Sequence, residues 1–159
     1  MRLAVYHQSA VNKSSVSLHI ALKTNTYFSF LMFLIVVWIN YISKVRNGLG
    51  EVNRAWYGGV VVLWTVMEAP RLLLGSRGNL QGNVASLVGF LMLTILGFFP
   101  IMIVYNVIIP EGNSVDYAIS VVQLMLGVAE VLLCLRMIRR TVRESTYNFF
   151  VFLGARIEA

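Results

Sequence analysis

The sequence has few charged residues. Asp, Glu, Lys and Arg make up 13% of its 159 residues, whereas 58% are hydrophobic. Soluble domains carry about 25% charged residues, so this composition, with a mean hydropathy of +0.74, excludes an ordinary soluble domain. The chain has one cysteine, Cys134, and two distant histidines, His7 and His19. An intramolecular disulfide is therefore impossible, and a metal site is unsupported.

Sequence motifs for catalysis are also missing. We find no nucleophile beside a histidine, no paired catalytic carboxylates and no cofactor fingerprint. The glycines that follow Gly75 lack the preceding strand and the Lys-Ser/Thr ending of a phosphate-binding loop. We therefore predict no catalytic, cofactor-binding or metal-binding residue, and no small-molecule substrate. Nucleic acid is not expected as a partner either, because membrane topology explains the pI of about 9.8.

Long apolar runs are what the sequence has in abundance. Four runs, at about 26–43, 55–74, 84–109 and 115–138, approach or exceed the roughly 20 residues with which a helix crosses a bilayer. They are continuous rather than alternating, which excludes a membrane β-barrel. The connections between them are short and contain Gly, Asn or Pro. We predict an all-α, polytopic membrane protein with a four-helix transmembrane bundle.

The predicted bundle forms a single membrane domain over residues 1–159, with an N-terminal tail (1–25) and a basic C-terminal tail (139–159). Nine Lys and Arg residues lie at the end of the bundle that holds both tails: Arg2, Lys13, Lys23, Arg77, Arg136, Arg139, Arg140, Arg143 and Arg156. The loops at the other end hold three, Lys44, Arg46 and Arg54. The positive-inside rule therefore predicts that both termini are cytoplasmic.

Four of these arginines form a stripe where the fourth span leaves the membrane. Arg136, Arg139, Arg140 and Arg143 recur at i, i+3, i+4 and i+7, which places them on one helical face. Each basic residue near an anionic lipid surface gains about 1 kcal/mol. We predict that the stripe contacts anionic lipid at the cytoplasmic leaflet, and recognition of phosphoinositides or of a cytosolic partner is the alternative.

Two charged residues, Glu68 and Arg71, interrupt the second apolar run. A charge near mid-membrane costs roughly 2.5–3.5 kcal/mol, so the two must pair, reach the interface or face other protein. Their i, i+3 spacing allows pairing. Pro70 lies between them, and because it lacks an N–H it leaves the carbonyl of Val66 free. Glu130 of the fourth span lies at a similar depth, and we predict a buried cluster of Glu68, Arg71 and Glu130.

Three uses of this cluster are open: a structural lock between helices, a contact for a partner span, and a proton or ion path. A path is the least favoured, because no second polar step across the bilayer is evident. Just after the cluster, Gly75 is expected to end the helix with a positive φ. Gly78 and Asn79 are expected to form a tight turn before Leu80.

Several motifs together resemble one family of membrane proteins. They are Glu68-x-x-Arg71-Leu72-x-x-Gly75-x-x-Gly78-Asn79-Leu80-Gln81, then Gly89-Phe90, and Ser14-Ser15-Val16-Ser17-Leu18 leading to Asn25-Thr26-Tyr27-Phe28. This pattern resembles the transmembrane protein 17 family, small four-span proteins of the ciliary transition zone. The resemblance covers roughly residues 14–140, and Pro70 departs from it, since an aliphatic residue is expected there.

The resemblance implies a non-enzymatic structural subunit of the Meckel-syndrome, or tectonic-like, complex at the ciliary base. It implies a multi-pass protein of the ciliary membrane at the transition zone, with the other transmembrane subunits of that complex as partners. Its implied roles are cilium assembly, the membrane diffusion barrier and, in animals, Hedgehog signalling. The residues alone leave two other classes open. One is an accessory subunit of an organellar complex such as a mitochondrial one, which the acid-free N-terminal tail favours. The other is a small transporter or channel.

Overall fold

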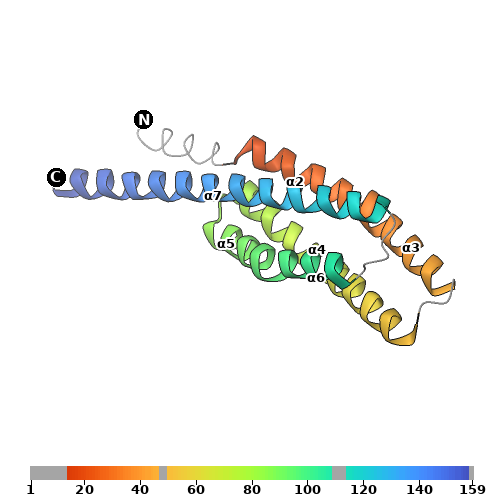
Figure 1. The fold of residues 1–159 in the computed structure, drawn as a ribbon. Helices are drawn as coiled ribbons and strands as arrows, with labels where there is room; N and C mark the ends of the chain where they lie inside the picture. The colour runs from red at the N-terminus through yellow and green to blue at the C-terminus, as the bar shows by residue number, and fades with distance from the viewer. Residues whose placement is uncertain (1–13, 47–49, 109–113, 158–159) are drawn as a thin grey trace.

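The computed structural model describes residues 14–46, 50–108 and 114–157, and all of its regular elements in these ranges are helical. Four helical stretches are long and apolar enough to cross a membrane, which confirms the all-α, four-span prediction. They pack side by side into an elongated bundle (Figure 1). Residues 1–13 of the predicted N-terminal tail and residues 109–113, between the third and fourth apolar runs, lie outside the described ranges.

Two of the four stretches are single helices and two contain a π-helical segment. The first is α2 (Val16–Phe28), η1 (Ser29–Leu34) and α3 (Ile35–Arg46); the second is α4 (Glu51–Gln81); the third is α5 (Val84–Met92), η2 (Leu93–Phe98) and α6 (Phe99–Ile108); the fourth is α7 (Ser114–Ile157). Short π-helical segments inside α-helices often mark functional positions. Here Ser29 begins η1 and Phe98 ends η2.

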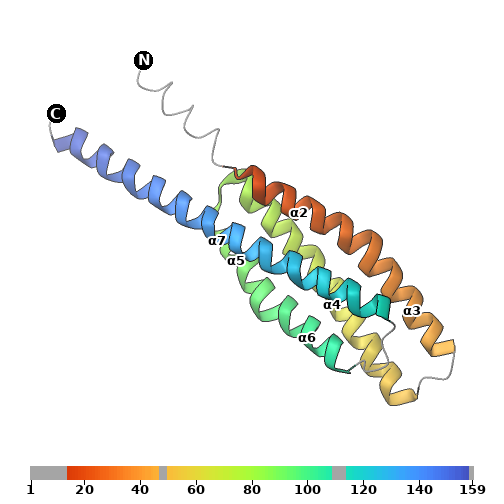
Figure 2. The same ribbon diagram turned by 45° about the horizontal axis from the view of Figure 1, so that its top comes forward.

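The first and last helices extend past their predicted spans. The first begins at Val16, inside the predicted tail 1–25, with Ser15 as its N-cap. The hydroxyl of Ser15 accepts a hydrogen bond from Leu18 N at 3.4 Å, which satisfies one of the free N–H groups of the first turn. The last helix continues through the predicted basic tail to Ile157. Its end projects beyond the bundle on the side where α2 begins (Figure 2).

The predicted turn at Gly75 and Gly78-Asn79 is wrong. The helix α4 continues through all three residues to Gln81. Gly82 follows as its C-cap, and it is the one described residue with a positive φ, 61°. A glycine in a helix interior costs about 1 kcal/mol relative to alanine. Helix α4 tolerates two of them here because both are packed closely against neighbouring helices.

The buried side chains form two apolar layers along the bundle. One contains Tyr57, Val61, Trp64, Phe98 and Met102 with their neighbours. The other, nearer the start of α2, is made of these residues: Leu18, Leu22, Leu87, Phe90, Leu91, Cys134 and Met137. In α4, residues 65–74 separate Trp64 of the first layer from Gly75, which contacts the second. Glu68 and Arg71, the buried charged residues of α4, lie in this interval.

Candidate functional site

The centre of the candidate site is the guanidinium of Arg71, which is 1% exposed. It donates to both carboxylate oxygens of Glu68, through Nε to Oε2 at 2.8 Å and through Nη2 to Oε1 at 2.6 Å. Its remaining nitrogen, Nη1, donates to Glu130 Oε2 at 2.7 Å. Two-pronged arginine–carboxylate pairs are strong and fix the geometry of both groups. The structure therefore brings Glu68, Arg71 and Glu130 together. The helical spacing of the first two and the expected membrane depth of Glu130 predicted this cluster.

A chain of polar side chains extends this cluster to the first and fourth spans. The Ser29 hydroxyl donates to Glu68 Oε1 at 2.9 Å and also lies 3.2 Å from Asn25 Oδ1. Gln123 Nε2 donates to Ser29 Oγ at 2.7 Å and to Asn25 Oδ1 at 3.0 Å. All of these side chains are buried. Hydrogen bonds among buried polar groups strengthen one another where the local dielectric is low.

The third span contributes two aromatic rings. The guanidinium carbon of Arg71 lies 4.4 Å from the ring centroid of Phe98 and 5.6 Å from that of Phe90. A cation over an aromatic face is attracted by the ring quadrupole, and more strongly when it is desolvated. With these rings, the cluster contacts all four spans. We call the set of Asn25, Ser29, Glu68, Arg71, Phe90, Phe98, Gln123 and Glu130 the ionic layer.

Chemically, the ionic layer is suited to holding helices together. Arg71 is bonded to a carboxylate through each of its three nitrogens and is 1% exposed, so its guanidinium is not open to a substrate from solution. A buried charge left without its partner destabilises a protein by about 3–5 kcal/mol. Because its members come from four separate helices, the layer is complete only when all four are correctly docked. This arrangement penalises any other packing of the bundle.

Pro70 and Leu80 lie on the outer surface of α4. Pro70 is exposed inside the helix, which continues past it, and Leu80 is 61% exposed. A proline is tolerated in a transmembrane helix where neighbouring groups or local adjustment satisfy the backbone. Pro70 thus faces outward from the bundle, although the sequence places it between Glu68 and the buried Arg71.

Asn79, predicted to lie in a turn, instead joins two helices. Its side chain is buried, its Oδ1 accepts from Ser15 N at 2.9 Å, and its Nδ2 donates to Ser15 O at 3.1 Å. Ser15 is the N-cap of α2, so the end of α4 fixes the start of α2. The exposed residue Asn83 caps α5 instead, by accepting from Ala85 N at 3.0 Å.

Gly75 and Gly78 allow neighbouring helices to approach α4. A Cβ on Gly75 would lie 2.9 Å from both Leu22 Cδ2 and Phe90 Cδ2. A Cβ on Gly78 would lie 2.9 Å from Leu87 Cγ and 3.0 Å from the backbone nitrogen of Leu87. Small residues serve close helix contacts in membranes in this way. The two glycines therefore set the spacing between α2, α4 and α5.

The four arginines of the predicted basic stripe, Arg136, Arg139, Arg140 and Arg143, are all exposed on α7 where it leaves the bundle. Arg140 pairs with Glu144, Nε to Oε1 at 2.8 Å, but both side chains are exposed. Such surface pairs contribute little to stability. The stripe is free of the ionic layer and accessible along its length.

Sequence reasoning missed Asn25, Ser29 and Gln123. A signal for two of them was present, since Ser29 and Gln123 are polar residues inside apolar runs, where polar side chains usually face the interior of a bundle. Asn25 stands at the entrance to the first run and has no such signal. In the described ranges, no three His, Cys, Asp or Glu side chains are grouped so that they could hold a metal ion.

Comparisons with known proteins point to one family. A family model described as a "Predicted membrane protein" matches residues 20–127. Transmembrane protein 17B of Danio rerio is 28% identical over 143 residues, which is 87% of this chain and 73% of that protein. Transmembrane protein 17 of Gallus gallus is 26% identical over 91% of this chain and 69% of that protein.

Transmembrane protein 17 of Bos taurus is 33% identical to this chain over 93 residues. These residues make up 57% of this chain and 44% of the bovine protein, so the match spans less than half of the bovine protein. No solved structure gives a significant match. The family match covers more than half of the chain and includes most of the first span, the second and third spans, and the start of the fourth as far as Gly127. The chain with this four-helix bundle and ionic layer belongs to the transmembrane protein 17 family.

Proposed function

We propose that this protein is a non-enzymatic structural subunit of the ciliary transition-zone membrane complex, where it supports cilium assembly and the membrane diffusion barrier. The observation that carries the proposal is membership of the transmembrane protein 17 family, because the resemblance of the motif string implies this role. Its location is then the ciliary membrane at the transition zone, and its partners are other transmembrane subunits of that complex.

The geometry of the ionic layer supports a structural role. A transport site must bind and release its cargo, whereas Arg71 is held by Glu68 and Glu130 at 2.6–2.8 Å and covered by two aromatic rings. Separating these groups in a medium of low dielectric is costly. The layer therefore favours one rigid packing of the four spans, as a scaffold subunit requires.

The exposed surface supports partners met inside the bilayer. Outward-facing side chains of all four spans are large and apolar, as Leu31, Leu63, Leu96 and Leu132 illustrate, each more than half exposed. Beyond the bundle, the exposed part of α7 carries Arg136 and Arg143, which suit anionic lipid at the cytoplasmic leaflet. Other transmembrane helices and this lipid surface are the two kinds of contact that we propose.

Localisation tests the proposal directly. A C-terminally tagged copy is expressed in ciliated cells beside markers of the ciliary base and of mitochondria. We expect the tag at the base of cilia, and loss of the protein should shorten or remove cilia. A mitochondrial pattern would overturn the proposal in favour of the organellar alternative.

Reconstitution tests the transporter alternative. Liposomes that contain the purified protein are loaded with a pH-sensitive dye and, separately, with small fluorescent solutes. We expect no flux above that of empty liposomes. A flux that Glu68→Gln abolishes and that the surface variant Arg77→Gln preserves would contradict a purely structural role.

A further inference from the structure

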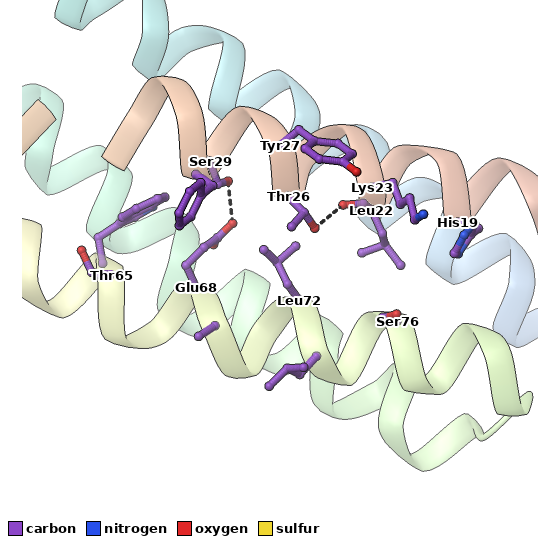
Figure 3. A pocket seen from close by; sticks show the side chains of 14 residues that line it. His19, Leu22, Lys23, Thr26, Tyr27, Ser29, Thr65, Glu68, Leu72 and Ser76 are labelled. Carbon is purple, nitrogen blue, oxygen red and sulfur yellow. Dashed lines mark hydrogen bonds between the residues drawn. The ribbon is translucent and has the colours of Figure 1, made fainter. Parts of the chain in front are cut away.

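A groove between the first and second spans lies next to the ionic layer. It has a volume of about 660 Å³, within the range of pockets that hold a small ligand. Residues of α2, η1 and α4 line it (Figure 3). The exposed side chains of Tyr27, Phe30 and Leu73 stand at its margin, so the groove faces the surrounding lipid rather than the interior of the bundle.

The position of the groove in the membrane follows from the charged residues of the first span. Lys23 and Lys44 are 21 positions apart, and the 20 residues between them carry no charge. At about 1.5 Å per residue this distance matches the roughly 30 Å of hydrocarbon in a bilayer. Lys23 thus lies at the membrane boundary on the side where α2 begins. The groove runs inward from there to Trp64, about 18 Å along α4 from Ser76, which is close to the thickness of one leaflet.

The mouth of the groove and its inner part differ in chemistry. Lys23, His19 and Ser76 line the mouth. Lys23 is exposed and forms no ion pair with any residue that the structure describes. A cation at the depth of the lipid headgroups attracts an anionic phosphate. The hydroxyl of Ser76 and the ring of His19 stand beside it as further hydrogen-bonding groups.

Polar groups deeper in the groove already have partners within the protein. Thr26 Oγ1 donates to the carbonyl of Leu22 at 2.7 Å, and Thr65 Oγ1 donates to the carbonyl of Val61 at 2.8 Å. The hydroxyl of Ser29 donates to Glu68, as described for the ionic layer. An occupant therefore needs no polar group at this depth. The remaining wall, which includes Ala69, Leu72 and Leu73, suits hydrocarbon.

We propose that this groove binds one anionic phospholipid of the cytoplasmic leaflet, with its phosphate at Lys23 and an acyl chain along Leu72 and Leu73. Lys23 supplies a cation at the depth of the lipid headgroups. The apolar wall is about as long as one leaflet is thick, and its polar groups are already hydrogen-bonded within the protein. Together these features fit an anionic phospholipid. The proposal requires that the end of the bundle with Lys23 faces the cytoplasm. It does not require the ciliary role, so the two can fail separately.

Native mass spectrometry of the purified full-length protein tests the charge at the mouth. The protein is equilibrated with equal amounts of phosphatidylserine and phosphatidylcholine, and the retained lipid is identified. We expect one retained phosphatidylserine in preference to phosphatidylcholine. Lys23→Gln should lower this preference about five-fold. The control Arg46→Gln removes one positive charge from an exposed site at the end of α3, outside the groove and outside the arginine stripe, and should leave the preference unchanged.

A second pair of variants tests the groove itself. Ala69→Leu adds volume to its wall, while Ala129→Leu makes the same change at an exposed position on α7. Both should elute as monodisperse, helical protein, because each adds an apolar side chain to a lipid-facing surface. We expect Ala69→Leu to lose the retained lipid and Ala129→Leu to keep it. Equal retention of phosphatidylcholine, displacement by cholesterol, or full retention in Ala69→Leu would each overturn the proposal.

Discussion

At the scale of single residues, Arg71 holds the ionic layer together. Its removal leaves the carboxylates of Glu68 and Glu130 buried without the cation that both contact. We therefore expect Arg71→Leu to lower the free energy of unfolding by about 3–5 kcal/mol. The measurement is thermal unfolding of the purified protein in detergent, followed by its intrinsic fluorescence, together with the yield of folded protein.

Arg77→Leu is the matched control, since Arg77 lies exposed on the same helix and forms no ion pair with the described residues. It should unfold close to the wild-type temperature. The double variant Glu68→Leu, Arg71→Leu should recover only part of the stability that Arg71→Leu loses, because Glu130 stays unpaired. The triple variant that also carries Glu130→Gln should recover more. An Arg71→Leu protein as stable as the wild type would show that the layer does not lock the helices.

At the scale of elements, the contact between α4 and α5 depends on Gly78. A methyl group there would meet the backbone nitrogen of Leu87 at 3.0 Å, and a backbone cannot move aside as a side-chain tip can. We expect Gly78→Ala to destabilise the bundle by about 1–3 kcal/mol, although alanine is the better helix former. The midpoint of thermal unfolding in detergent measures the change.

Gly59→Ala is its control on the same helix. A Cβ at Gly59 would have no atom within 4 Å, so only the helix propensity changes. This variant should be more stable than the wild type by about 1 kcal/mol or less. If Gly78→Ala is stabilised to the same extent, the close approach of α5 to α4 is not what requires glycine there.

At the scale of the whole molecule, four spans place the start of α2 and the end of α7 on the same side of the membrane. The positive-inside rule predicts that this side is the cytoplasm. Single cysteines test it: Ser145→Cys on the projecting part of α7, and Gly50→Cys at the opposite end, where a Cβ has no atom within 4 Å. The wild type, whose Cys134 is buried, gives the background.

A charged maleimide that crosses no membrane is added to intact cells and, separately, to cells whose plasma membrane has been permeabilised. We expect Gly50→Cys to be labelled in intact cells and Ser145→Cys to be labelled only after permeabilisation. The reverse pattern would invert the proposed topology. It would also place Lys23 and the lipid groove in the other leaflet.

Much of this architecture could be predicted because lipid imposes strict local rules. Each crossing needs a long apolar run, and so the four spans could be located without knowledge of their neighbours. The pairing of Glu68 with Arg71 followed from helical spacing, and the addition of Glu130 followed from its depth. By contrast, Gly75 and Gly78 carry the local signature of a helix end, and that signature gave the wrong boundary for α4.

The sequence by itself determined the number of spans, the helical class and the need to neutralise two charges inside the second span. These properties depend on single segments and their solvent. Only the tertiary structure decided that Gly78 is a contact rather than a turn, and that Asn79 anchors the start of α2. It also decided that Ser29 and Gln123 complete the ionic layer, and that a groove opens beside Glu68. These features depend on which faces of helices meet when their residues are up to 98 positions apart in the chain, and local propensity carries no information about that choice.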